Sequence, residues 1–213
     1  DLIAAGIGSK DKYRVFFPGL PAPKTFAKAG VQSALGISSQ TLFITFVGRL
    51  TQIKRPDRLL DVSAECKRRG IDLRFLVAGE GELFESSKQR ALKDQLNVTF
   101  FGWRSDIDQI FAASDIAILT SDNEGIPLTL IQAAQAGLPI VATNVGSISD
   151  IVINESTGYL TATAAAEMAD AIEKLVRDPQ LRQMMGAAGK AHTERYFSLD
   201  RMIKDHSDLY RSL

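Results

Sequence analysis

The sequence predicts an α/β fold: a Rossmann-like, doubly wound sheet of about six parallel strands in three α/β/α layers, with extra helices at the C-terminus. From residue 41 onward, short apolar runs alternate with longer helical segments, and glycines such as Gly70 and Gly137 end the helices. Strands and helices that alternate at these lengths form right-handed crossovers, which place the strands parallel. Three helical segments follow the last apolar run and account for the extra helices.

The expected strands are short apolar runs, typical of a sheet that is covered on both faces. They lie at residues 42–48, 73–78, 97–101, 115–120, 139–143 and 158–160. Helices are expected at residues 56–69, 82–95, 106–113, 127–136, 164–177, 179–196 and 200–212, with a short helix or turn at 146–153. Residues 14–19 are expected to form a further short strand that runs into a loop rich in proline and glycine.

Composition limits the classes of protein that the chain can represent. The 213 residues carry 25 basic and 25 acidic side chains, a balance that argues against a broad nucleic-acid-binding surface. The single cysteine, Cys66, cannot form an internal disulfide, so we expect a reducing, cytoplasmic setting. No apolar run approaches the roughly 20 residues that cross a bilayer. The chain begins at Asp1 without a methionine, and we expect it to be a piece of a longer protein.

A doubly wound sheet binds ligands beyond the carboxyl ends of its strands, so the loops at that edge are the candidates. The loop that follows the strand at 42–48 carries Arg49, Lys54 and Arg55. An arginine fork with a lysine suits a diphosphate, because charged hydrogen bonds are roughly twice as strong as neutral ones. A solvated basic loop is the alternative, and the position alone does not decide between them.

Other polar motifs favour structural roles. Residues 79–82 hold a Gly-Glu-Gly motif that lacks the third glycine of a dinucleotide site, so we interpret it as a sharp turn. Asp106 and Asp108 lie two residues apart in an expected helix, where their carboxylates diverge and cannot share a metal. His192 and His206 have no nearby ligand partner, and Cys66 lies on an apolar helix face, in the expected core.

The segment Glu124-Gly125-Ile126-Pro127 precedes another expected helix. Pro127 suits the first helical position, because its missing N–H leaves no hydrogen bond unmade there. A helix N-terminus presents free amides and a positive dipole to an anion, and Gly125 allows close approach. Glu124 adds a carboxylate that can accept hydrogen bonds from hydroxyls, or it merely favours the helix dipole. Together these features suggest a site for a phosphorylated sugar or nucleotide.

Six pieces occur in a fixed order and spacing. They are Gly48–Lys54, Val77–Gly81, Val98–Trp103, Ala113–Ser121, Glu124–Pro127 and Ala136–Thr143. This series resembles the nucleotide-sugar-binding C-terminal domain of retaining glycosyltransferases with the GT-B fold, in particular glycosyltransferase family 4 (glycosyl transferases group 1). The resemblance covers about residues 14–212.

The resemblance implies roles for particular residues. Arg49 and Lys54 would grip the donor diphosphate, and Glu124 would contact the donor sugar. These three would be the catalytic residues. The residues implied to bind the donor are Gly48, Trp103, Arg104, Gly125, Ile126, Pro127, Leu128, Thr129 and Gln132. Among them, Trp103 and Arg104 would border the base, and the amides of Leu128 and Thr129 would face the phosphates.

The resemblance also implies a reaction and its partners. A UDP-, GDP- or ADP-sugar would donate a hexosyl group to an acceptor hydroxyl of a glycan, lipid or polysaccharide precursor, with retention and without a metal or other cofactor. Residues 1–12 would be the linker from an absent N-terminal acceptor domain, and residues 13–213 would form the donor-binding domain. We expect this chain to bind a donor but to transfer little or no sugar. We expect the whole protein to act in the cytoplasm or at the cytoplasmic face of the membrane, without binding nucleic acid.

Gln132 departs from the family pattern, which has a glutamate at this position to hold the ribose hydroxyls. Glutamine offers one acceptor oxygen and an amide donor in place of a carboxylate. We expect a loss of about 1–2 kcal/mol, roughly tenfold in affinity. A non-catalytic nucleotide-sugar-binding module therefore stays open as an alternative, as does a sugar-nucleotide 2-epimerase of the same overall fold.

Overall fold

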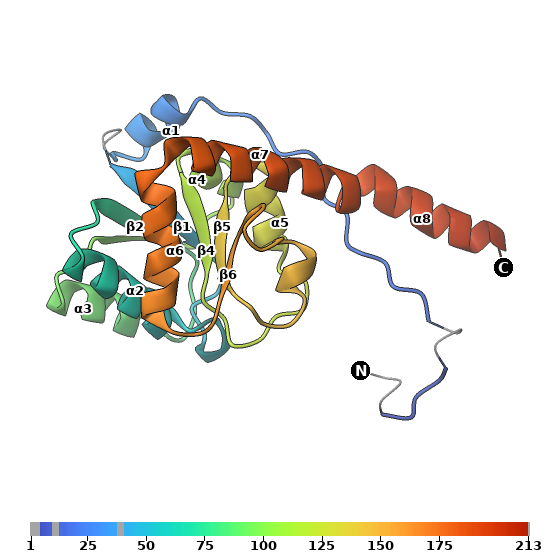
Figure 1. Ribbon diagram of the computed structural model, residues 1–213, viewed down its shortest axis with the longest axis horizontal. Helices are drawn as coiled ribbons and strands as arrows, with labels where there is room; N and C mark the ends of the chain where they lie inside the picture. The colour runs from blue at the N-terminus through green and yellow to red at the C-terminus, as the bar shows by residue number, and fades with distance from the viewer. Residues whose placement is uncertain (1–4, 10–12, 38–40, 213) are drawn as a thin grey trace.

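The computed structural model describes residues 5–9, 13–37 and 41–212. Its strands form a single six-stranded sheet with the order β3-β2-β1-β4-β5-β6, and every pairing is parallel (Figure 1). The strands are β1 (Leu42–Val47), β2 (Leu73–Ala78), β3 (Val98–Gly102), β4 (Ile116–Leu119), β5 (Ile140–Thr143) and β6 (Gly158–Thr161). The predicted fold class and the predicted number of strands are confirmed.

Helices cover both faces of this sheet. They are α1 (Lys28–Ala34), α2 (Pro56–Arg68), α3 (Phe84–Lys93), α4 (Ile107–Ala112), α5 (Leu128–Gln135), α6 (Ala165–Arg177), α7 (Pro179–Tyr196) and α8 (Leu199–Ser212), with the short 3₁₀ turns η2 (Gln52–Lys54) and η3 (Ile148–Asp150). On one side α2 packs against α3 and α6, and on the other α1 packs against α4 and α5 against α7 (Figure 1). The sheet is therefore the middle of three layers.

The strand order places the candidate site. β1 lies between β2 and β4, and the chain leaves β1 toward one face and β4 toward the other. The two loops that follow these strands therefore diverge, and they leave a crevice beyond the carboxyl ends. The loop after β1 carries Arg49 and Lys54, and the loop after β4 carries Glu124. The sheet topology thus brings together two motifs that lie 70 residues apart.

Burial explains the composition of the central strands. All four residues of β4 and β5 are buried, as are the last five of β1, because helices cover both faces. Met168, Ile172 and Leu175 of α6 are completely buried, as the spacing of apolar residues predicts. Cys66 is 1% exposed, so its predicted place in the core is confirmed.

The N-terminal part of the chain differs from the prediction in two ways. Residues 14–19 form no strand, and an isolated bridge joins Leu20 to Ser198. This segment lies along α8 instead of a sheet edge, because Arg201 donates a 2.6 Å hydrogen bond to the carbonyl of Phe17. The helix α1 was not predicted. It is held by tertiary contacts, in which the buried Gln32 side chain donates to the carbonyl of Ala113.

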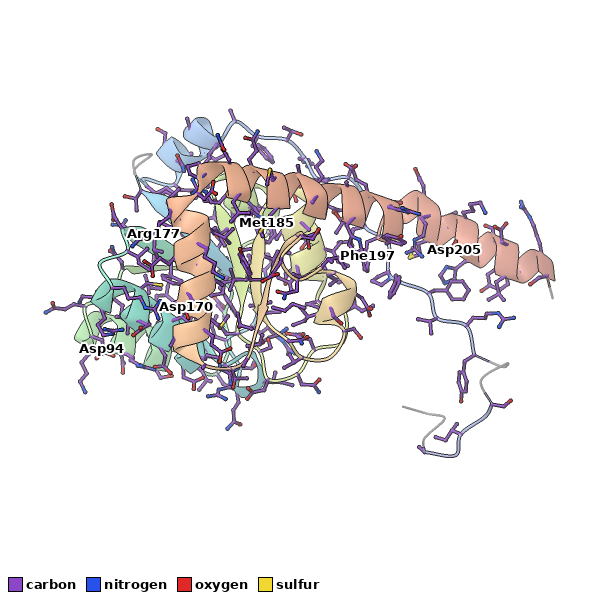
Figure 2. The ribbon with its side chains drawn as sticks, in the orientation of Figure 1. Asp94, Asp170, Arg177, Met185, Phe197 and Asp205 are labelled. Carbon is purple, nitrogen blue, oxygen red and sulfur yellow. The ribbon has the colours of Figure 1, made fainter. Side chains whose placement is uncertain are left out.

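The last helix extends away from the sheet (Figure 1). At its start, Phe197 is fully buried and its ring lies 5.1 Å from that of Phe17; Figure 2 labels Phe197 between α7 and α8. No residue of α8 itself is buried among the described residues, and Tyr210 is 73% exposed. In the described part of the chain, no helix has the combined length and apolar character that spanning a membrane requires.

Close packing at the ligand-facing edge depends on glycine. Gly79 has a φ of +140°, and a Cβ at this position would overlap the carbonyl oxygen of Gly48. We expect Gly79→Ala to lower the free energy of unfolding by about 2 kcal/mol or more, because both the backbone conformation and the space forbid a side chain. Urea denaturation measures this change.

Gly30 is the matched control, because it lies in the exposed part of α1 with no atom near its missing Cβ. We expect Gly30→Ala to raise the free energy of unfolding by about 0.5–1 kcal/mol. An equal change in the free energy of unfolding for the two substitutions would contradict the close packing at Gly79.

Candidate functional site

Hydrogen bonds join the loop after β1 to the loop after β4. The hydroxyl of Thr120 lies within hydrogen-bond distance of two carbonyls, 3.0 Å from that of Lys54 and 3.1 Å from that of Arg55. The amide of Asp122 donates to the carbonyl of Ile53 at 2.9 Å. These contacts bridge the crevice between β1 and β4 and hold the side chains of the two loops in a common frame.

Lys54 and Glu124 meet across these loops. The Nζ of Lys54 lies 2.5 Å from Oε1 of Glu124, and the hydroxyl of Ser121 donates to the same oxygen at 2.5 Å. Only 8% of the Glu124 side chain and 20% of the Lys54 side chain is exposed. Reduced contact with water strengthens the attraction between the two charges. Two of the three residues implied to be catalytic therefore form one unit.

Arg49 lies at a separate part of the same edge. Its side chain is exposed, and it forms no ion pair with any residue that the structure describes. It lines a hollow of about 480 Å³ together with Gly48, Trp103 and Arg104. The structure thus brings four of the predicted donor-binding and catalytic residues to one concave surface.

Trp103 and Arg104 form one wall of this hollow. Trp103 is 70% exposed, and its backbone N–H donates to the carboxylate of Glu80 at 3.3 Å. Arg104 forms two hydrogen bonds to Asp106, at 2.6 and 2.8 Å, and these lower the pKa of the Asp106 carboxyl. The Arg104 charge is thus already compensated, whereas the Trp103 ring presents an open apolar face.

The N-terminus of α5 provides amide donors. Pro127 is buried and caps the helix, which begins at Leu128, so the expected start at Pro127 was one residue too early. Within the described chain, the amides of Gly125, Ile126, Leu128 and Thr129 donate no backbone hydrogen bond. Such unpaired amides at a helix start favour an anion.

Gln132 lies one turn further along α5. Residues three and four apart share a helix face, so Gln132 lies beside Leu128 and Thr129. Its side chain is half-buried, and it makes no hydrogen bond to a residue in the described part of the chain. This placement permits contact with a ligand at the helix start.

Two acidic residues pair with Arg55. Arg55 has a left-handed backbone, with φ of 51°, and pairs with Asp57 at 2.8 Å and with Asp122 at 2.9 Å. These hydrogen bonds raise the pKa of Arg55 and lower the pKa of both carboxyls. Of the three cations predicted in this loop, Arg55 is therefore the one that the fold neutralises from both sides.

The remaining motifs form a turn and part of the core. Gly79 and Gly81 form a turn, in which the carbonyl of Glu80 accepts the amide of Leu50 at 2.9 Å. Burial raises the pKa of the Cys66 thiol to about 12, which disfavours a nucleophilic thiolate. In the described residues, no group of three or more His, Cys, Asp and Glu side chains is arranged to hold a metal ion.

Comparison with known sequences identifies the family. The model of the family described as glycosyl transferases group 1 matches residues 31–192. The chain belongs to this family. It is 30% identical to a D-inositol 3-phosphate glycosyltransferase of Saccharomonospora viridis, over 94% of the chain and 50% of that protein. It is 28% identical to the Escherichia coli UDP-Gal:alpha-D-GlcNAc-diphosphoundecaprenol alpha-1,3-galactosyltransferase, over 84% of the chain and 48% of that protein.

Solved structures show a similar fold. Anabaena HepE in complex with UDP and glucose superimposes with a TM-score of 0.90 at 23% identity, over 99% of this chain and 60% of that one. The C-terminal domain of a group 1 glycosyl transferase from Francisella tularensis gives a TM-score of 0.72 at 19% identity, over 87% of this chain and 97% of that one. The chain has the fold of a C-terminal domain of a GT-B glycosyltransferase, and it spans about half the length of the curated relatives named above.

Sequence reasoning missed several residues that hold the candidate site together. The Thr120 hydroxyl contacts the carbonyl of Lys54, and the Ser121 hydroxyl donates to Glu124. Arg58 contacts the carbonyls of Thr120 and Ser121. Ser121 could have been found as a hydroxyl three residues before Glu124, at the end of a strand. Arg58 could have been found as a cation in the first turn of a helix, where the dipole disfavours it.

The lowered pKa of Asp122 leads to a prediction about acid. A carboxyl whose pKa falls on folding stabilises the protein at any pH above its ordinary pKa of 3.8. This stabilisation is lost as the pH falls from 3.8 through the lower pKa of the folded state. We expect Asp122→Asn to lower the free energy of unfolding by about 1 kcal/mol at pH 7. The difference from the unsubstituted chain should shrink below pH 3.8. Urea denaturation at pH 7 and pH 3 measures it.

Asp72→Asn is the control, because Asp72 is exposed and forms no ion pair with another described residue. Its substitution should leave the free energy of unfolding nearly unchanged at both pH values. If Asp122→Asn lowered the free energy of unfolding by the same amount at pH 3 and pH 7, the Asp122 charge would not be the source of the stabilisation.

Proposed function

We propose that the chain is the donor-binding half of a retaining, metal-independent glycosyltransferase, which moves a sugar from a nucleoside-diphosphate sugar to an acceptor hydroxyl. One observation carries the proposal. At the switch point between β1 and β4, the Lys54–Glu124 pair lies in the same crevice loops as the exposed Arg49 and the free amides before α5. Cations and amides at one edge suit a diphosphate, and a carboxylate among them suits sugar hydroxyls.

The chemistry of the leaving group supports these roles. When the bond from sugar to phosphate breaks, negative charge concentrates on the departing diphosphate. Preorganised donors aimed at that charge stabilise the transition state, and Arg49, Lys54 and the helix dipole of α5 would supply them. Three such groups can replace a divalent cation, and this is the basis for proposing a reaction without metal.

The pairing of Lys54 with Glu124 supports a proposal for how the site would change on binding. In the structure, the lysine balances the carboxylate. An arriving diphosphate would compete for Lys54, and Glu124 would then accept hydrogen bonds from the donor sugar while Ser121 still holds it. The exposed ring of Trp103 and the hollow beside Arg49 would receive the base.

Related proteins support a nucleotide-sugar donor. The E. coli relative carries UDP-Gal in its name, and Anabaena HepE has been solved with UDP and with UDP-glucose. We therefore choose UDP as the first probe. The position of Gln132 favours one second candidate, a non-catalytic module that binds nucleotide sugars, since the amide weakens the ribose contact that the family's glutamate makes.

Calorimetric titration of the chain with UDP, GDP and ADP tests the proposal. We expect one of the three to bind, and Lys54→Met to weaken that binding by about 10- to 100-fold, because a hydrogen bond to a charged group contributes about 1.5–3 kcal/mol. Lys93→Met removes an exposed lysine from the last turn of α3 and should leave the affinity unchanged. If no nucleoside diphosphate binds, the proposed function is wrong.

Gln132→Glu tests the ribose contact. A carboxylate can accept hydrogen bonds from both ribose hydroxyls, so we expect this substitution to raise the affinity for the bound nucleotide about tenfold. The same titration with the 2′-deoxynucleotide is the control, because it lacks one of the two hydroxyls and should gain less. An unchanged affinity for the ribonucleotide would show that residue 132 does not touch ribose.

A further inference from the structure

Arg58 occupies a position that neither helix formation nor solvation explains. It is the third residue of α2, and only 6% of it is exposed. The first turn of a helix repels a cation, since the positive end of the helix dipole lies there. Arginine is almost never buried unless it is paired. A specific set of partners must therefore hold Arg58 in place.

These partners are the first residues beyond β4. The Nη1 of Arg58 donates to the carbonyl of Thr120 at 2.6 Å and lies 3.4 Å from that of Ser121. Both residues are completely buried, and both lie past the end of the β4 ladder. The Ser121 carbonyl also accepts a 2.7 Å hydrogen bond from the Thr143 hydroxyl, so the closer contact of Arg58 is the one to Thr120. The Nη2 of Arg58 donates to Asp122 at 2.6 Å. One planar guanidinium thus contacts three consecutive residues, as its fork of donors allows.

The contacts continue from this segment to the candidate site. The hydroxyl of Ser121 donates to the Oε1 atom of Glu124 that Lys54 also contacts. Arg58 itself is buried on α2 and does not line the hollow beside Arg49. It therefore acts on Glu124 through the backbone of Ser121, without reaching a ligand.

We propose that Arg58 is a positioning residue for the Glu124–Lys54 pair: its guanidinium fixes the exit of β4 and thereby the direction of the Glu124 carboxylate. The link to donor binding rests on the proposed function. The link to loop order does not, because it follows from the contacts alone. An arginine that only balanced the charge of Asp122 would have neither effect, since Arg55 also pairs with that carboxylate.

Arg58→Lys tests this proposal. Lysine keeps the charge but cannot serve two carbonyls and a carboxylate as one planar fork. Asp122 keeps its contact with Arg55, so we expect the variant to fold. Arg68→Lys is the matched control, because Arg68 lies on the same helix, is 71% exposed and forks onto Glu65.

Hydrogen exchange of the free chain gives the first readout. We expect Arg58→Lys to speed exchange of the amides at residues 120–125 about tenfold, an effect of one lost charged hydrogen bond. The strands β1 and β5 should exchange at the original rate, and Arg68→Lys should change none of these regions. Unchanged exchange at residues 120–125, or an equal increase across the sheet, overturns the proposal. This readout holds even if the chain binds no nucleotide.

Titration with UDP and UDP-glucose gives the second readout. We expect Arg58→Lys to weaken UDP-glucose binding about tenfold and UDP binding less, because Glu124 would face the sugar. In a Glu124→Gln background, Arg58→Lys should cause no further loss of the UDP-glucose preference. An equal loss for both ligands, or additive effects of the two substitutions, overturns the positioning role.

Ser121→Ala keeps the proposal testable if Arg58→Lys does not fold. It removes the hydroxyl that joins the loop to Glu124, and it leaves Arg58 and its carbonyl partners in place. We expect this variant to lose the UDP-glucose preference while residues 120–125 exchange at the original rate. A full preference for UDP-glucose in Ser121→Ala overturns the proposed path. If the chain binds GDP or ADP in place of UDP, that nucleotide and its sugar conjugate replace the two ligands. Failure of the unsubstituted chain to bind any of the three nucleoside diphosphates overturns the proposed function, and the exchange data then decide on Arg58.

Discussion

The hydroxyl of Thr120 contacts the carbonyls of Lys54 and Arg55, and it joins two loops that leave the sheet toward opposite faces. The strand order separates these loops, because the chain reverses its winding direction between β1 and β4. Without a bridge, the crevice would hold water and the side chains would lie on independent segments. A typical intramolecular hydrogen bond contributes about 0.5–1.5 kcal/mol, so the bridge also stabilises the fold. Thr120 thus joins the two motifs at one edge of the sheet, and Arg58 contacts the Thr120 carbonyl.

Charge at this edge is distributed unevenly, although the chain as a whole is neutral. Arg55, Arg58 and Arg104 each have a carboxylate partner and serve the scaffold. Arg49 is exposed, and Lys54 forms an ion pair with one carboxylate, that of Glu124. The cations that remain available to a ligand are therefore the two that the family resemblance assigns to the diphosphate. The carboxylates that pair with these arginines therefore also determine which cations can contact a ligand.

Glycine has a corresponding role in the backbone. A Cβ at Gly146 would overlap the carbonyl oxygen of Glu124, and one at Gly79 would overlap that of Gly48. The loops after β2 and β5 therefore approach the site loops more closely than any larger residue would permit. This close packing fixes the backbone of Gly48 and Glu124 at the edge that carries the candidate site.

The sequence by itself determined the alternation of strands and helices, the parallel sheet, the family and the location of the site loops, because these follow from local apolar patterns and ordered motifs. It also placed Glu124 just before a helix start. The tertiary structure decided which loops meet, and so it decided that Glu124 pairs with Lys54, that Arg55 pairs with two carboxylates and that Arg58 contacts the residues after β4. It likewise decided that residues 14–19 follow α8 and that α1 forms against Ala113. The physical reason is the same in each case: a hydrogen bond or ion pair between distant segments depends on the packing of both, and no local pattern encodes the partner.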